Sequence, residues 1–216
     1  MPELRLVIEG AEVAPHSATP MLFFKLAVRN DPPTQAIHTI VLRAQIQIEV
    51  TRRKYDRNEQ AQLGDLFGEP ERWANTLRNL LWTHASVVVP RFTGEIRVNV
   101  PVACTFDFNV AATKYFHGLN TGDLPLCFQF SGTIFYEGPD GALQVAPVSW
   151  DKDAKYRLPV LAWKNLMDAY YPNSAWLAVH RDTFERLYQC KVREGIPTWE
   201  EVLERALNAL SETVDS

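Results

Sequence analysis

This sequence lacks the features that mark export, membrane insertion or a disulfide-stabilised fold. None of its apolar runs approaches the roughly 20 residues that a helix needs to cross a bilayer. It has only three widely spaced cysteines, which is typical of reduced thiols inside the cell. The first residues, MPELRLVIEG, contain no basic segment followed by an apolar one, so we expect no signal peptide. These absences predict a soluble, cytoplasmic protein with no membrane insertion.

An excess of positive charge is missing as well. The chain has 22 Lys and Arg against 26 Asp and Glu, which gives a formal net charge of −4. Proteins that bind nucleic acids usually carry a basic surplus, so we expect no nucleic-acid partner. The one basic cluster, at 52–54, is followed at once by Asp56 and Glu59, and we interpret it as a solvated rim.

Common catalytic and metal-binding motifs are also absent. The sequence has no phosphate-binding glycine loop, no nucleophile elbow, no C-x-x-C and no H-x-x-x-H spacing. His84 and His117 could act as acid–base groups beside a carboxylate, although a rim histidine bonded to backbone is the simpler interpretation. We therefore expect no catalytic residue, no metal and no cofactor, and we favour a non-enzymatic protein.

Alternation of apolar and polar residues is abundant in the first 158 residues. In the stretch 104–136 it predicts two strands around a turn at 120–123. The apolar face of this pair would consist of Phe106, Phe108, Val110, Leu124, Leu126, Phe128 and Phe130. Further strands are predicted at 4–13, 21–30, 37–52, 83–90, 96–100, 143–150 and 155–158. The pattern predicts a mainly β protein, a two-sheet antiparallel β-sandwich of immunoglobulin-like or related type.

The central strand pair has a weak internal match. Residues 22–50 align with residues 106–134 at a constant offset of 84, with four of 29 positions identical. Two similar hairpins in one sandwich would explain this match, and so would an internal duplication.

Helical periodicity occurs in two places. An insertion at about 58–82 has apolar residues at helical spacing, and it interrupts the β-sandwich domain that we assign to 1–158. The segment 159–216 predicts an amphipathic helix followed by a helical hairpin, with capping pairs Asp182/Glu185 and Thr198/Glu201. This C-terminal segment could pack on its own sandwich or on a partner.

Two groups of residues are candidates for function. An aromatic cluster at the helix junction is our candidate protein-interaction site, although core packing explains it equally well; its members are Trp163, Tyr170, Tyr171 and Trp176. The alternative is a small-ligand-binding protein or enzyme with a pocket between the helical insertion and the sheet. Its lining would be Trp73, Arg78, Trp82, His84 and Asp107.

Several short segments together resemble a known family. They include Leu66-Phe67-Gly68, Trp82-Thr83-His84, Lys114-Tyr115-Phe116, the run 130–135 and Pro197-Thr198-Trp199. They resemble a bacterial family without an assigned function, whose members are often encoded near uptake nickel–iron hydrogenase genes. The resemblance implies an accessory or assembly factor whose partner is a hydrogenase subunit or maturation protein. It supplies no catalytic residues.

Overall fold

The computed structural model describes residues 2–105 and 110–214, with side chains described as far as 211. The chain divides into two compact units, Met1–Ser174 and Ala175–Ser216, which are described separately. The helix at 160–170 belongs to the first unit, so the boundary between the units lies after residue 174 and not at the predicted residue 159.

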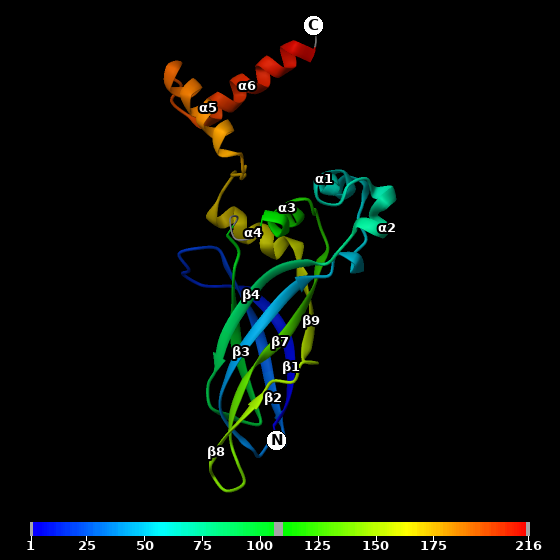
Figure 1. Cartoon of the computed structure of the whole chain (residues 1–216), viewed down its shortest axis with the longest axis vertical. Coiled ribbons are helices and arrows are strands. Elements are labelled where there is room, and N and C mark those ends of the chain that lie inside the picture. Colours follow the sequence, from blue (N-terminus) through cyan, green and yellow to red (C-terminus); the bar gives the residue numbers. More distant parts are fainter. Residues whose placement is uncertain (1, 106–109, 215–216) are drawn as a thin grey trace. The chain divides into compact units, whose positions relative to one another are not determined.

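The first unit contains two antiparallel sheets (Figure 1). The smaller sheet has the order β1–β2–β6, with β1 at Glu3–Val13, β2 at Met21–Asp31 and β6 at Glu95–Ala103. The larger sheet has the order β4–β3–β7–β8, and β9 also pairs with β7 while β5 pairs with β3. These strands are β3 (Ala36–Ile48), β4 (Leu80–Val89), β5 (Phe92–Thr93), β7 (Asp123–Glu137), β8 (Leu143–Pro147) and β9 (Asp153–Pro159). The predicted mainly β, two-sheet antiparallel sandwich is confirmed.

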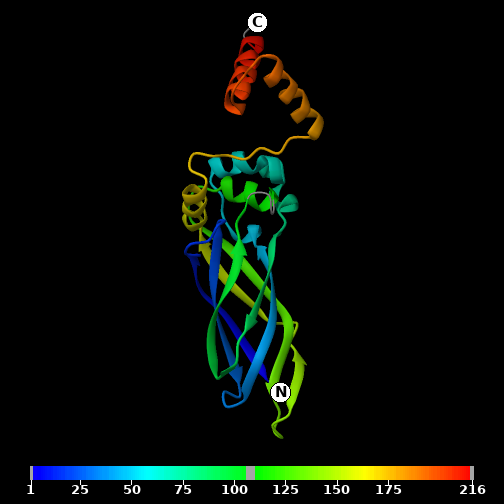
Figure 2. The same ribbon diagram turned by 90° about the vertical axis from the view of Figure 1, so that its left-hand side faces the viewer.

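Helices gather at one end of the two sheets (Figures 1 and 2). They are α1 (Arg57–Phe67), α2 (Trp73–Thr76), α3 (Val110–His117) and α4 (Val160–Tyr170), with short 3₁₀ turns at Val50–Arg52 and Pro70–Arg72. The predicted helical insertion is present between β3 and β4. It ends sooner than predicted, because β4 already begins at Leu80.

The core fills the space between the two sheets. Inward side chains of β2 face those of β3 and β7, and the ring of Phe24 meets the ring of Phe128 edge-on at 5.0 Å. Both phenylalanines are completely buried. A side chain of this size contributes roughly 1.5–3 kcal/mol when it leaves water. Because every second side chain of these strands points inward, the two sheets enclose one continuous apolar layer.

The prediction of a first strand in the stretch 104–136 was wrong for the residues that the structure describes. Residues 110–117 form helix α3, and residues 106–109 lie outside the described residues. The physical reason is a change of period: Ala112, Tyr115 and Phe116 are buried at helical spacing. The two-hairpin interpretation was also wrong, because β2 and β3 lie in different sheets and do not pair.

The second unit contains α5 (Arg181–Arg193) and α6 (Trp199–Val214). The predicted cap of α6 is present, since the Glu201 amide donates to Oγ1 of Thr198 at 3.2 Å. The predicted cap of α5 was wrong: His180 occupies the cap position without a side-chain hydrogen bond, and Asp182 lies inside the first turn. A helix of sufficient length and apolarity to traverse a membrane does not occur in the described parts of the chain.

Candidate functional site

The two tryptophans of the predicted pocket belong to the aromatic core. Trp73 packs edge-on against Tyr55 at 5.3 Å, and its indole nitrogen donates to the carbonyl of Gly68 at 2.8 Å. Trp82 packs edge-on against Phe116 at 5.1 Å. Both tryptophans are buried. Trp73 joins α2 to the segment that contains α1, and Trp82 joins β4 to α3, so both rings are part of the packed core.

The polar members of that predicted pocket point elsewhere. In the pairing of β3 with β4, Ile46 lies opposite Thr83 and Gln47 opposite Leu81, so Trp82 is the extra residue of a β-bulge. The bulge turns Trp82 inward and leaves His84 exposed on the outer face, where its ring contacts Gln45 at 3.3 Å. Arg78 is exposed, and Asp107 lies outside the described residues.

The cavity that described residues form beside Trp82 is too small for a ligand. A cavity between Trp82, Phe116 and Trp163 has a volume of about 10 Å³. A cavity of this size holds one water molecule at most. Of the four predicted pocket residues that the structure describes, Trp73 and Trp82 are buried in the core, whereas Arg78 and His84 are exposed at the surface.

The predicted aromatic interface is divided between core and surface. Trp163 keeps only 2% of its exposure and packs against Phe116 at 5.0 Å, so it cannot form an open contact surface. Tyr170 is half-buried and donates its hydroxyl to the carbonyl of Ser17 at 2.7 Å. Tyr171 is half-buried against the same core, whereas Trp176 is exposed and belongs to the second unit. The face of α4 that carries Trp163 packs on the first unit's core, which explains why the cluster is not a surface patch.

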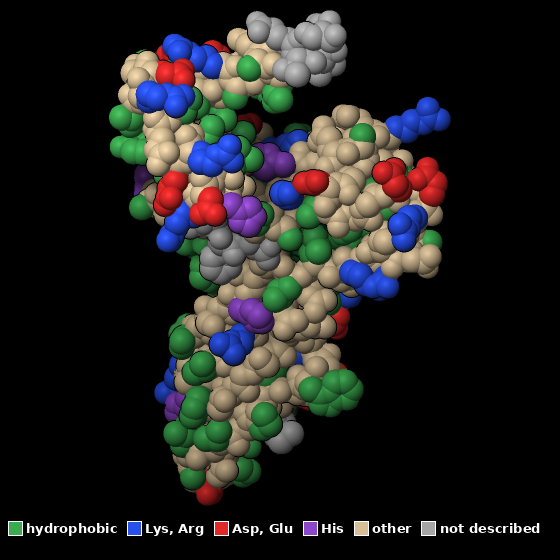
Figure 3. Space-filling view, turned by 45° about the horizontal axis from the view of Figure 1, so that its top comes forward, with side chains coloured by type: hydrophobic (Ala, Val, Ile, Leu, Met, Phe, Trp, Pro, Cys, Tyr) green, Lys and Arg blue, Asp and Glu red, His purple; other side chains and the backbone are tan. Residues whose placement is uncertain are grey.

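The second unit has an apolar surface that its own described residues do not cover. Among its described side chains at 175–211, only Ile196 and Val202 are buried. Six large apolar residues of the two helices are exposed, and Leu207 keeps 62% of its exposure. They are Phe184, Tyr188 and Val192 on α5 and Leu203, Leu207 and Leu210 on α6. Figure 3 shows hydrophobic side chains open to solvent on these helices, at the top of the view. We call this set the C-terminal apolar face.

The two helices contact one another through the first turn of α6. The ring of Trp199, in the first turn of α6, lies 5.1 Å from Phe184 and 6.3 Å from Tyr188. Nζ of Lys191 lies 6.0 Å from the centre of the Trp199 ring and donates to the carbonyls of Ile196 and Pro197. These contacts stabilise the turn between the helices. They leave the leucines farther along α6 without a covering element within the unit's described residues.

The outer face of the larger sheet carries a polar hollow of about 490 Å³. Amide side chains connect its strands, because Gln45 and Gln47 both donate to Oε1 of Gln129 at 3.3 and 3.2 Å. Lys155 donates to Glu49 at 2.6 Å, and this hydrogen bond raises the pKa of Lys155. Trp150 stands almost fully exposed at the rim. The hollow offers donors, acceptors and one aromatic face to a small polar molecule.

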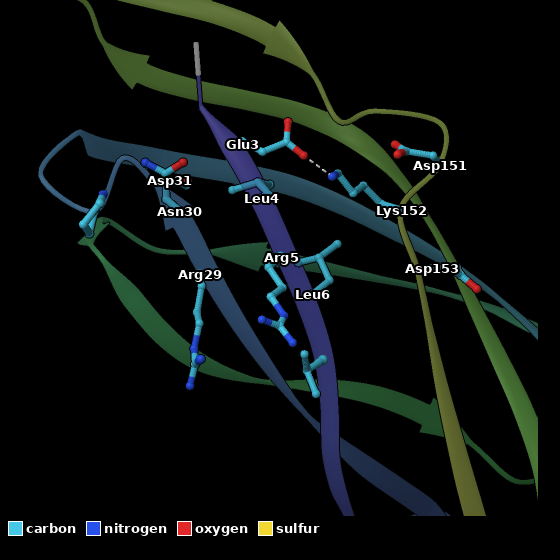
Figure 4. A pocket seen from close by; sticks show the side chains of 12 residues that line it. Glu3, Leu4, Arg5, Leu6, Arg29, Asn30, Asp31, Asp151, Lys152 and Asp153 are labelled. Atoms are coloured by element: carbon cyan, nitrogen blue, oxygen red, sulfur yellow. Dashed lines mark hydrogen bonds and ion pairs between the residues drawn. The ribbon is translucent and has the colours of Figure 1, made fainter.

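A second groove, of about 680 Å³, lies where β1 approaches the loop before β9 (Figure 4). An ion pair between Glu3 and Lys152 spans it. Arg5 and Arg29 lie opposite each other on β1 and β2, and acidic residues line the other side. The mixed charges and the ion pair make this groove a seam between the sheets, with no convergent set of groups of one chemistry.

Sequence reasoning missed the C-terminal apolar face as a site, although the signal was present. The apolar spacing of α5 and α6 predicted two amphipathic helices, but spacing does not tell whether another element covers the apolar side. Across the described ranges, no three His, Cys, Asp or Glu side chains gather as they would around a metal ion.

Comparisons with known proteins give a family and no activity. Residues 1–215 match the model described as "Family of unknown function (DUF6084)". No curated protein matches the chain. Among solved structures, the chain is similar to the solution structure of a putative late embryogenesis abundant (LEA) protein, with 16% identity over 74% of each chain and a TM-score of 0.35. Because the family match spans nearly the whole sequence, this chain belongs to the DUF6084 family of unknown function.

Proposed function

We propose that this protein is a non-enzymatic assembly or accessory factor that associates with another protein chain through the C-terminal apolar face. One observation carries the proposal: the second unit buries only two of its described side chains, Ile196 and Val202. Exposed apolar patches of this kind commonly mark protein contact sites.

The energetics of short helices support this proposal. The helices α5 and α6 have 13 and 16 residues. Isolated helices of this length are marginally stable in water and depend on packing of an apolar face. Among the described side chains of the second unit, that packing consists of the contacts of Trp199 with Phe184 and Tyr188 and the burial of Ile196 and Val202. A partner chain that covers the remaining leucines would supply the missing burial.

The resemblance in sequence suggests which protein the factor would act on. It makes a hydrogenase subunit or a hydrogenase maturation protein the first client to test. Amphipathic helices that lay an apolar face into a groove are a recurring mode of protein recognition. The net charge of −4 favours a protein client over a nucleic acid.

A photo-crosslinking experiment tests the proposal directly. A photoreactive phenylalanine analogue replaces Leu207 in the full chain, and the same analogue replaces Leu143 as the control. The two leucines are equally exposed, at 62% and 60%, but Leu143 lies on β8 of the sandwich. We expect crosslinks from position 207 to a second protein chain, identified by mass spectrometry, and none from position 143. If position 207 reacted only with residues 1–174 of its own chain, the proposal would be refuted.

The polar hollow on the larger sheet supports a second candidate function, which is binding of a small polar ligand. Gln129 and Lys155 provide hydrogen-bonding groups beside the exposed ring of Trp150. Titration with neutral disaccharides and with free amino acids, followed through the indole and amide side-chain NMR signals, tests this candidate. Shifts confined to Trp150, Gln47 and Gln129 would support it, and unchanged signals up to millimolar ligand would remove these two ligand classes.

A further inference from the structure

We infer that the chain covering the C-terminal apolar face is a second copy of this protein, so that α5 of one copy packs on α6 of the other. This inference rests on the proposed function, because it names the occupant of the same face. Three features of the two helices carry it: their charges, the positions of those charges beside the apolar residues, and the shapes of the apolar side chains.

The two helices carry opposite net charge. Between Arg181 and Arg193 there are four basic and two acidic residues, whereas between Trp199 and Val214 there are one basic and four acidic residues. A two-fold axis that places α5 on the partner's α6 brings a basic helix onto an acidic helix twice. Such an interface is self-complementary, as the symmetry of a homodimer requires.

The charges beside the apolar face are available for pairing between copies. Glu200 and Glu204 precede Leu207 by seven and three residues, so they flank the apolar side of α6. Arg181 precedes Phe184 by three residues and flanks the apolar side of α5 in the same way. None of these three charged side chains forms an ion pair with any described residue.

The one basic residue of α6, Arg205, forms ion pairs within its own copy. Arg205 pairs with Glu201 at 2.6 Å and with Glu194 at 3.7 Å. Arg205 lies two residues before Leu207 and Glu201 six residues before it. At about 100° per residue, both side chains therefore lie on the side of α6 away from Leu207. Arg205 therefore does not pair with Glu200 or Glu204, and these two carboxylates can pair with a basic helix of the second copy.

The apolar side chains of the two helices differ in a complementary way. α5 presents the rings of Phe184 and Tyr188, whereas α6 presents the leucines 203, 207 and 210. Rings that insert between leucines one turn apart are the usual packing of knobs into holes between helices. In a dimer with α5 on α6, each copy supplies both the rings and the leucines. The C-terminal apolar faces of both copies are then buried together.

The mass of the full chain in solution tests the inference. Sedimentation equilibrium of the wild type should give a dimer of about 49 kDa, twice the 24.6 kDa of one chain. Leu207→Glu should give a monomer, because it places a carboxylate in the buried centre of the interface. Leu143→Glu, the same change at an equally exposed position on the sandwich, should remain a dimer.

A charge exchange tests the pairing of α5 with α6 without touching the apolar residues. The variant Glu200→Lys/Glu204→Lys makes both helices basic, and Arg181→Glu reverses the charge of the basic residue beside the apolar side of α5. Each variant alone should self-associate at least about tenfold more weakly than the wild type, and an equimolar mixture should form the heterodimer preferentially. A mixture that shows no preference would overturn the arrangement of α5 on α6.

The outcomes separate this inference from the proposed function. A wild type that is monomeric at all concentrations, or a dimer that survives Leu207→Glu, overturns the self-association. If the wild type is monomeric while position 207 crosslinks to a different protein, the self-association fails and the proposed function stands. If position 207 crosslinks only within its own chain, both fail.

Discussion

Arg53 and Glu59 form an ion pair that is almost completely removed from solvent. Nη2 of Arg53 lies 2.5 Å from Oε1 of Glu59, and the two side chains keep 9% and 3% of their exposure. The same guanidinium donates to the carbonyls of Thr121 and Asp123, and the same carboxylate accepts from the Asn120 amide at 2.9 Å. This pair therefore joins the first turn of α1 to the turn that precedes β7.

Glu59→Gln should destabilise the first unit strongly. The change leaves the guanidinium of Arg53 buried without a counter-charge, and breaking a buried ion pair in this way costs about 3–5 kcal/mol of unfolding free energy. Urea unfolding of the full chain measures the change. Asp65→Asn removes one carboxylate from the same helix but breaks only the exposed pair with Lys114, so it should change stability little. Equal effects of the two variants would contradict the structural role of the buried pair.

Gly132 sits where β7 approaches β3 too closely for a side chain. Its φ is +151°, and a Cβ atom there would lie 2.1 Å from the carbonyl oxygen of Val41. Gly132→Ala should therefore lower the unfolding free energy by about 2–4 kcal/mol, because the backbone of β3 must move. Gly64 in α1 is the matched control, since nothing lies within 4 Å of its added Cβ. Gly64→Ala should stabilise the protein by about 0.5–1 kcal/mol. A neutral Gly132→Ala variant would show that β3 and β7 are not this close.

Strands could be predicted where one face is buried, because apolar and polar residues then alternate within the strand itself. Alternation alone located β1, β2 and β3, because each strand carries its inward residues at every second position. Strand pairing was not predictable in this way, since β2 pairs with β6 and β3 with β7 over long sequence separations. The predicted hairpin of β2 and β3 failed for this reason.

Side-chain environments were harder to predict than elements. The basic residue Arg53 was interpreted as part of a solvated rim, yet its side chain is buried and bonds to Glu59 and to two backbone carbonyls. Trp163 was a candidate contact residue, but the apolar face of α4 packs inward and buries its ring. Sequence periodicity identifies an apolar face, while the element that covers the face depends on tertiary structure.

His117 should make the first unit less stable at mildly acidic pH. Burial lowers the pKa of His117 below its usual value of 6.5, the nearby charge of Lys164 lowers it further, and Asp168 opposes both. Between the lowered and the usual pKa, the unfolded chain binds a proton that the folded chain does not, so protonation favours unfolding. The stability that neutral His117 contributes is complete above about pH 6.5 and is lost as the pH falls below that value.

The difference between the wild type and His117→Gln isolates this contribution from other titrating groups. Urea unfolding at about pH 8 and about pH 5 should show a larger loss of stability on acidification for the wild type than for the variant. The ring of His117 contacts Trp163 edge-on at 5.2 Å, so the variant also loses some packing at both pH values. Identical pH dependence in the two proteins would show that His117 titrates normally in the folded state.

Cys190 should react with alkylating reagents long before Cys104 does. Burial raises the pKa of the Cys104 thiol to about 12, so only about one thiol in ten thousand is ionised at about pH 8. Cys190 is half-exposed on α5 and should be modified first by iodoacetamide, followed by mass spectrometry of the peptides. Cys104 should stay unmodified until urea unfolds the first unit, and then react as fast as Cys190. Cys190→Ser should leave the protection of Cys104 unchanged, whereas rapid modification of Cys104 in the folded protein would show that the core beside Trp82 opens to solvent.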